Sequence, residues 1–81
     1  MAQRQARLRV PADIGLAIRQ ARLDHGLTQQ ELAELLEVSQ SAISEMESGK
    51  STKFLRLILE AFRATGITVS ATWEADRAPG S

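Results

Sequence analysis

The run from Gln40 to Ser48 carries side chains that could read the edges of nucleic-acid bases. As a helix, which turns about 100° per residue, this run would have one polar side and one apolar side. Glutamine can pair bidentately with adenine, and serine can donate to or accept from a base edge. The pattern predicts base reading, and the alternative is a solvated face with no partner. The residues predicted to read bases are Gln40, Ser41, Ser44 and Glu45.

Two short helices joined by a tight turn are predicted to position this face. Thr28 is followed three residues later by Glu31, which is the spacing of a capping box at a helix start. Ser39 can cap the helix that begins at Gln40. The earlier helix is expected to bury Leu32, Ala33, Leu35 and Leu36. The later helix is expected to turn inward Ala42, Ile43 and Met46.

Residues 27–50 resemble the helix-turn-helix of the Cro/phage-repressor (Xre) family. That family usually reads Leu-Thr-Gln-x-x-Leu-Ala, then a Gly-Val-Ser turn, then a short helix ending in Ile-x-x-x-Glu-x-Gly-Lys. The matching positions are Leu27, Thr28, Gln29, Leu32, Ala33, Val38, Ser39, Ile43, Glu47, Gly49 and Lys50. One position departs, because Glu37 stands where the family usually has glycine. If that turn needs a positive φ, Glu37 costs on the order of 1 kcal/mol there.

Positive charge flanks the motif, although the net charge of the chain is zero. Residues 1–22 balance to +4 and residues 50–63 to +3, whereas residues 23–49 carry six acids and no Lys or Arg. Basic flanks that fold beside the reading helix can supply phosphate contacts. We expect phosphate contacts from Gln29, at a helix N-terminus, and from Ser39, Lys50 and Lys53.

Glu47 lies at the edge of the apolar side of the reading helix. A part-buried carboxylate costs several kcal/mol unless a cation pairs with it. The cations between Pro11 and Glu47 are Arg19 and Arg22. The family resemblance favours Arg22, because Xre-type domains pair an arginine at this spacing with the glutamate of the reading helix. Such a pair would be structural and would not touch bases.

Before this motif, we expect a basic arm at residues 1–10 and then a helix from Pro11 to about His25. Three interpretations of the arm remain open: a frayed terminus, a segment that binds phosphates or the minor groove, or a short strand near Leu8 and Val10. Leu16 and Leu23 lie opposite the predicted core face of the helix. They are either scattered surface leucines or a small contact for a partner protein.

After a further helix over about residues 52–65, the pattern changes to that of a half-buried strand. The apolar positions of this strand are Ile67, Val69, Ala71 and Trp73. A lone strand cannot satisfy its backbone groups. The chain offers one weak partner, the possible strand near Leu8 and Val10, so we expect pairing with the same strand of a second copy. The predicted organisation is an arm (1–10), a helix-turn-helix domain (11–66), a dimerising strand (67–74) and a flexible tail (75–81). The fold class is mainly α, a four-helix repressor-like domain with one C-terminal strand pairing across a dimer.

Four helices followed by a strand resemble the HipB-type antitoxins, whose dimers close with an intermolecular β-lid. The resemblance implies a cytoplasmic homodimeric repressor that binds an inverted-repeat operator in double-stranded DNA and neutralises a HipA-type serine/threonine kinase toxin. The alternatives are a stand-alone regulator and a protein-bridging module that does not bind DNA. The sequence has no cysteine, one histidine and no apolar run of membrane-spanning length. We therefore expect no catalytic residues, metal, cofactor or membrane partner.

Overall fold

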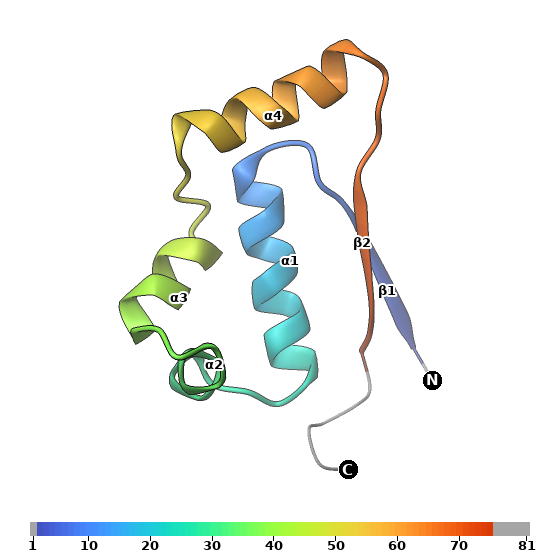
Figure 1. The fold of residues 1–81 in the computed structure, drawn as a ribbon. Coiled ribbons are helices and arrows are strands. Elements are labelled where there is room, and N and C mark those ends of the chain that lie inside the picture. Colours follow the sequence, from blue (N-terminus) through green and yellow to red (C-terminus); the bar gives the residue numbers. More distant parts are fainter. Residues whose placement is uncertain (1, 76–81) are drawn as a thin grey trace.

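The computed structural model describes residues 2–75, which form four helices and two strands (Figure 1). In chain order the elements are β1 (Gln3–Arg7), α1 (Pro11–Asp24), α2 (Gln29–Leu36), α3 (Gln40–Glu47), α4 (Lys53–Ala64) and β2 (Ser70–Glu74). The predicted mainly helical fold is confirmed. No helix within residues 2–75 is long and apolar enough to cross a membrane. Except for Ala75, the predicted flexible tail lies outside the described residues.

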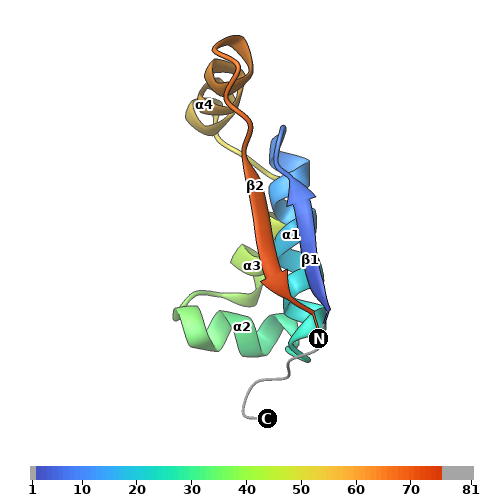
Figure 2. The ribbon, with the colours of Figure 1, turned by 90° about the vertical axis from the view of Figure 1, so that its right-hand side faces the viewer.

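Helix α1 is the centre of the molecule. It packs against α3 on one side and against the two-stranded sheet on the other, while α2 packs on α3 (Figures 1 and 2). The inner face of α1 follows the predicted periodicity, because Ala17 is buried and Ile14 and Ile18 are half-buried. The reading helix α3 is therefore attached to the body of the molecule mainly through α1.

Local capping explains where three of the helices begin. The Thr28 hydroxyl accepts the backbone N–H of Glu31, and the Glu31 carboxylate accepts that of Thr28 at 2.8 Å, which completes the predicted capping box. Ser39 caps α3 and Thr52 caps α4 through the same kind of side-chain acceptor. Glu37 ends α2 with φ 57°, so this non-glycine residue does adopt the strained left-handed conformation.

The C-terminal strand finds a partner inside the chain, which corrects an expectation from the sequence. β2 pairs antiparallel with β1, placing Arg4 opposite Trp73. Residues 3–7 of the expected basic arm are thus a strand, and β2 satisfies one edge without a second copy. Apolar alternation did not reveal β1, because its side chains are mostly exposed and backbone hydrogen bonds hold it. Pairing of two β2 strands across a dimer stays a prediction.

The apolar side of the C-terminal segment faces α1 in the same chain. Val69, Ala71 and Trp73 are half-buried, as the alternation predicted, and β2 contacts α1. Ile67 differs, because it precedes the strand and is 51% exposed. The described strand accordingly begins at Ser70, three residues later than expected. Part of the predicted dimer strand therefore already packs against α1 of the same chain.

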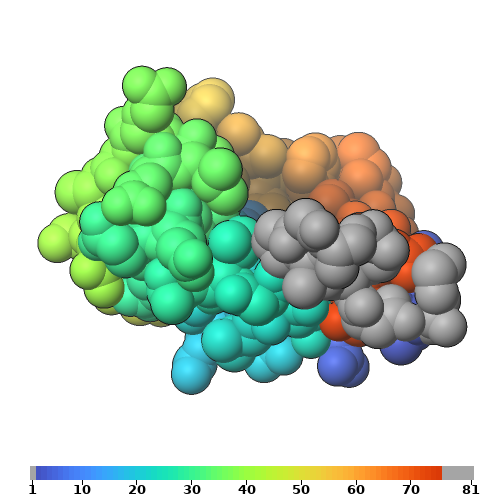
Figure 3. Space-filling view, turned by 90° about the horizontal axis from the view of Figure 1, so that it is seen from below, coloured from blue at the N-terminus to red at the C-terminus, as the bar shows by residue number. Residues whose placement is uncertain are grey.

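The core formed by the described residues is small. Its buried apolar residues are Ala17, Ala33, Ile43 and Leu59. Leu35 and Leu36, which were expected to be buried, are 67% and 53% exposed. The reason is the position of α4, which lies at the end of the molecule opposite α2 and packs at most weakly on any other described element (Figure 1). Seen from below, α2 faces the viewer and α4 lies behind it (Figure 3). The outer side of α2 consequently remains uncovered in the single chain.

Candidate nucleic-acid interface

Helix α3 presents its polar side outward. The four predicted base-reading residues are all exposed, namely Gln40, Ser41, Ser44 and Glu45. On the inner side, Ile43 has 0% exposure and anchors the helix against its neighbours. Met46, expected to point inward as well, is 38% exposed. The helix therefore offers a row of amide, hydroxyl and carboxylate groups to a partner while one isoleucine fixes it to the body.

The carboxylate of Glu47 is the centre of a buried polar network behind this face. Arg22 donates from Nε to Glu47 Oε2 at 2.6 Å and from Nη2 to Oε1 at 3.1 Å. Only 9% of the Arg22 side chain and 4% of the Glu47 side chain are exposed. The hydrogen bonds from Arg22 hold the pKa of Glu47 below its ordinary value, and the same bonds raise the pKa of Arg22. The expected pair thus joins α1 to the end of α3.

A chain of hydrogen bonds extends from this pair to the first base-reading residue. Gln29 donates from Nε2 to Glu47 Oε1 at 3.1 Å, and Gln40 donates from Nε2 to Gln29 Oε1 at 3.4 Å. Gln29 is the first residue of α2, and Gln40 is the first residue of α3. The bond uses one of the two amide hydrogens of Gln40 and leaves the other hydrogen and the oxygen for a partner. The network can therefore orient the group that would pair with a base.

Two further site residues contact each other at the exposed end of α3. Lys50 Nζ lies 3.2 Å from Glu45 Oε2, and both side chains are more than half exposed. Exposed ion pairs contribute about 0–1 kcal/mol, so this pair can open when a phosphate approaches. The remaining predicted phosphate contacts are placed by helix starts: Ser39 caps α3 and Lys53 begins α4. Lys50 also lowers the repulsion that Glu45 alone would exert on DNA.

The basic arm does not lie beside α3, which corrects one interpretation of residues 1–10. Strand β1 and α3 flank α1 on opposite sides (Figure 1). Arg4 pairs with Asp24 at the end of α1 at 2.8 Å, and Asp24 also accepts the indole N–H of Trp73 at 2.8 Å. The bond from Trp73 and that from Arg4 lower the pKa of Asp24. These contacts fasten the sheet to α1.

The possible partner face on α1 is exposed as expected. Leu16 is 55% exposed and Leu23 is 49% exposed, so both are accessible in the single chain. His25 follows α1, and its Nε2 lies 3.1 Å from the carbonyl oxygen of Glu74. A contact between the two leucines and another protein stays a prediction.

Gly15 supports the reading helix from behind, a structural role that the sequence analysis missed. A Cβ atom at Gly15 would lie 2.5 Å from the carbonyl oxygen of Met46 and 2.6 Å from that of Glu47. The last turn of α3 therefore rests directly on the backbone of α1, beside the pair of Arg22 and Glu47. The available signal was a glycine inside an otherwise regular helix, where it costs about 1 kcal/mol relative to alanine and often has a packing reason.

Comparisons with known proteins agree with this architecture. Residues 18–71 match a family model described as Helix-turn-helix, which covers the second half of α1 through to the start of β2. The chain is 33% identical over 63 residues to "Uncharacterized HTH-type transcriptional regulator y4mF" of Sinorhizobium fredii, covering 78% of this chain and 83% of that protein. It is 40% identical over 58 residues to "Multiprotein-bridging factor 1a" of Arabidopsis thaliana, covering 72% of this chain. This match spans only 41% of the bridging factor. No solved structure matches.

Proposed function

The chain belongs to the helix-turn-helix family of DNA-binding regulators, and we propose that it is a repressor that recognises a specific operator sequence. One observation carries the proposal: the exposed side of α3 consists of short amide, hydroxyl and carboxylate groups. The same helix is fixed from behind by Ile43 and by the pair of Arg22 and Glu47. A rigid helix with such a face suits the major groove, where each base pair presents a distinct pattern of donors and acceptors.

Base contacts in this proposal come from α3, and phosphate contacts come from around it. Gln40 would read adenine, and Ser41, Ser44 and Glu45 would contact neighbouring base edges. Gln29 at the start of α2 would hold a phosphate, together with Ser39, Lys50 and Lys53. The exposure of these side chains, apart from the half-buried Gln29, supports this division of roles. A homodimer would place two reading helices on the halves of an inverted repeat.

The experiment that tests the proposal is selection from a random pool of DNA duplexes at near-physiological salt. We expect the wild-type protein to enrich an inverted repeat. Gln40→Ala should lose about 1–3 kcal/mol of affinity for that site and relax specificity at one position in each half. Lys50→Ala serves as the matched comparison, because losing a phosphate contact should weaken all sequences alike and lower the salt slope by about one.

The outcomes of this selection separate the roles of the residues. Enrichment that survives Gln40→Ala unchanged would remove this residue from base reading. Equal loss on every duplex would make it a phosphate contact. No enrichment by the wild-type chain would overturn the proposal of sequence-specific repression for the isolated protein.

The antitoxin role is a finer part of the proposal. It is supported by the order of four helices followed by strand β2, which resembles the HipB-type antitoxins, although in this chain β2 also pairs with β1. The partner would be a HipA-type serine/threonine kinase toxin, and the exposed leucines Leu16 and Leu23 are one surface that such a protein could contact. Capture of the tagged chain from its host should retain a kinase in stoichiometric amount. A regulator that binds its operator and retains no kinase would be a stand-alone repressor.

The match to a bridging factor favours one alternative. Forty per cent identity over 58 residues to "Multiprotein-bridging factor 1a" is compatible with a chain that binds other proteins through this fold. In that case the exposed face of α3 would not read bases. The duplex selection distinguishes the two functions, because a bridging module would bind DNA weakly, without sequence preference, and Gln40→Ala would change nothing.

A further inference from the structure

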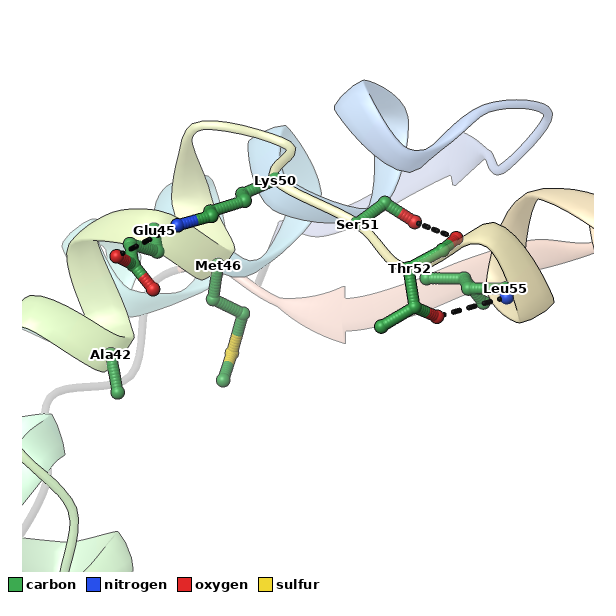
Figure 4. Close-up of a pocket in the computed structure, with 7 residues that line it drawn as sticks. All are labelled: Ala42, Glu45, Met46, Lys50, Ser51, Thr52 and Leu55. Carbon is green, nitrogen blue, oxygen red and sulfur yellow. Dashed lines mark hydrogen bonds and ion pairs between the residues drawn. The ribbon is translucent and has the colours of Figure 1, made fainter.

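A hollow of about 390 Å³ separates α3 from α4 and is open to solvent (Figure 4). Ala42 and Met46 of α3 point into the same open space, and Leu55 lines it from the side of α4. The hollow has polar edges, formed by the pair of Glu45 and Lys50 and by Thr52. In the single chain, this apolar floor faces water.

Helix α4 has more apolar surface than its own chain covers. Leu59 is its one buried residue, and it faces the loop that leads into α1. Phe54 is 70% exposed and Leu57 is 59% exposed. Leu57 precedes Leu59 by two positions, or about 200° around the helix, so the two leucines face nearly opposite directions. The apolar residues of α4 form one broad arc with Leu57 and Leu59 at its two edges, opposite a polar arc. The chain covers the Leu59 edge and leaves the Leu57 edge to be covered by another surface.

The small core makes this exposure physically significant. Ordering a chain of this size costs about 1–2 kcal/mol of backbone entropy per residue, and burial of apolar surface must offset most of that cost. Two alanines, one isoleucine and one leucine are the buried apolar residues among positions 2–75. Burial of the exposed Met46, Phe54 and Leu57 against another surface would add to this small core. Packing against a second surface would therefore stabilise the described fold.

Charge indicates which second surface fits. The segment that carries α2 and α3, residues 23–49, has six acids and no Lys or Arg. Helix α4 itself has Lys53, Arg56 and Arg63 against Glu60, and balances to +2. Placing α4 of one chain on the α2–α3 side of another brings unlike charges together twice in a two-fold dimer, once for each copy. A copy of this chain thus matches the surface in both polarity and charge.

We propose that α4 of a second copy packs into the hollow between α3 and α4, and that the reciprocal contact is the dimer interface. The hollow is lined by Glu45 but not by Gln40, Ser41 or Ser44, so filling it leaves most of the reading face open. The use of this dimer to read an inverted repeat rests on the proposed function. The contact between the two copies does not depend on it. It differs from pairing of two β2 strands.

The first test is sedimentation equilibrium of the full chain without DNA. We expect a wild-type dimer that Leu57→Glu weakens by at least about 100-fold, because the carboxylate would be buried without a cation. Leu16→Glu is the matched control, since Leu16 is a leucine of similar exposure on α1. Its dimer should keep the wild-type affinity.

A second control tests the strand interface. The bonds from Leu8 N–H to the Val69 carbonyl and from Ala75 N–H to the Ala2 carbonyl show that odd-numbered residues of β2 bond to β1. The N–H of Thr72 therefore points to the open edge of β2, where proline removes no bond within the chain. Thr72→Pro should stay dimeric. A monomeric Thr72→Pro beside a dimeric Leu57→Glu would overturn the inference in favour of strand pairing, and a monomeric wild type would also overturn it.

Disulfide trapping covers the case in which Leu57→Glu fails to fold. The chain has no cysteine, so single cysteines can be placed on separate chains. A mixture of Leu57→Cys and Met46→Cys chains should form the mixed disulfide on mild oxidation, whereas Leu16→Cys with Met46→Cys should not. Equal yields from the two mixtures, or no bond from the first, would reject the contact. Neither experiment contains DNA, so both results would stand even if the protein recognised no operator sequence.

Discussion

Gln40 donates a hydrogen bond to Gln29 across 3.4 Å, and this bond links the first residue of the reading helix to the first residue of the helix before it. Gln29 in turn donates a hydrogen bond to Glu47, and Glu47 accepts a hydrogen bond from Arg22. The bond is long and exposed, so it favours one orientation of a proposed base-reading amide without fixing it, through a residue that needs no base contact of its own. Preorganisation of this kind reduces the ordering cost of binding.

Gln29→Ala should reduce operator affinity and also blunt discrimination at the position that Gln40 reads. Loss of one neutral hydrogen bond corresponds to about 0.5–1.5 kcal/mol, or roughly a 2- to 12-fold change in affinity. Titration of matched and single-mismatch duplexes measures both effects. Gln30→Ala is the control, because Gln30 bonds only within α2, to Glu34 at 3.3 Å. If Gln29→Ala weakened both duplexes equally, its role would be confined to phosphate binding.

Removing one partner of the buried ion pair should destabilise the fold strongly. Arg22→Ala leaves the Glu47 carboxylate buried without its cation, and such losses cost about 3–5 kcal/mol of unfolding free energy. The double change Arg22→Met with Glu47→Leu should recover most of that loss, because neither charge remains buried. Urea denaturation measures all three proteins. A double variant no more stable than Arg22→Ala would mean that the pair contributes through its hydrogen bonds to Gln29 and to the Leu27 carbonyl.

Stability should fall in acid partly because of Glu47. Its folded-state pKa is lowered from the ordinary value of 4.5, first by the hydrogen bonds from Arg22. The unfolded chain therefore binds the proton more readily, so the stabilisation is complete above about pH 4.5 and is lost as the pH falls through the lower folded-state pKa. Glu47→Gln should show a shallower loss of unfolding free energy between pH 5 and about pH 3. The pH dependence of the unfolding free energy that remains in this variant should come from Asp13 and Asp24, whose pKa values are also lowered. An unchanged slope would contradict the assignment.

Features governed by short sequence separation could be predicted from the sequence. The caps at Thr28 and Ser39 depend on residues three positions apart, and the turn at Glu37 depends on its own backbone. The pairing of Arg22 with Glu47 is long-range, but family resemblance and the shortage of other cations pointed to it. Charge limited the partner of Glu47 to Arg19 or Arg22, and the family resemblance favoured Arg22.

Features that depend on how distant elements dock could not be predicted in the same way. Residues 3–7 have no apolar alternation, yet their backbone pairs with β2. Leu35 and Leu36 have helical spacing that suits burial, but burial also requires an element to cover them, and α4 lies elsewhere. The packing role of Gly15 could not be predicted, because its neighbour, the end of α3, is about 30 positions away in the sequence. Periodicity indicates which side of a helix is apolar but does not indicate which element packs against that side.

The left-handed conformation of Glu37 should be relieved by glycine. Because glycine adopts φ near 57° without a Cβ clash, Glu37→Gly should raise the unfolding free energy by about 0.5–1 kcal/mol. Glu34→Gly is the matched control within α2, where glycine should instead cost about 1 kcal/mol. Thermal and urea denaturation give the sign in each case. Destabilisation by Glu37→Gly would show that the carboxylate makes a contribution larger than the backbone strain.

Gly15→Ala tests whether α3 rests on the backbone of α1. Alanine would gain about 1 kcal/mol of helix propensity, but its Cβ would meet two carbonyl oxygens at 2.5 and 2.6 Å. Those oxygens belong to the turn that holds Glu47, so α3 can retreat only by disturbing the pair with Arg22. Because overpacking costs about 1–3 kcal/mol, we expect a net loss of stability.

The variant should also lose operator affinity under conditions where it remains folded, because displacement of α3 moves every base-reading residue together. Gly66→Ala is the control: it also replaces a glycine, one with φ 80°, but its Cβ would meet nothing within 4 Å. It should lose about 1 kcal/mol from backbone strain and keep operator affinity. A Gly15→Ala protein that is more stable than wild type and binds the operator normally would show that helix propensity outweighs the contact between α1 and α3.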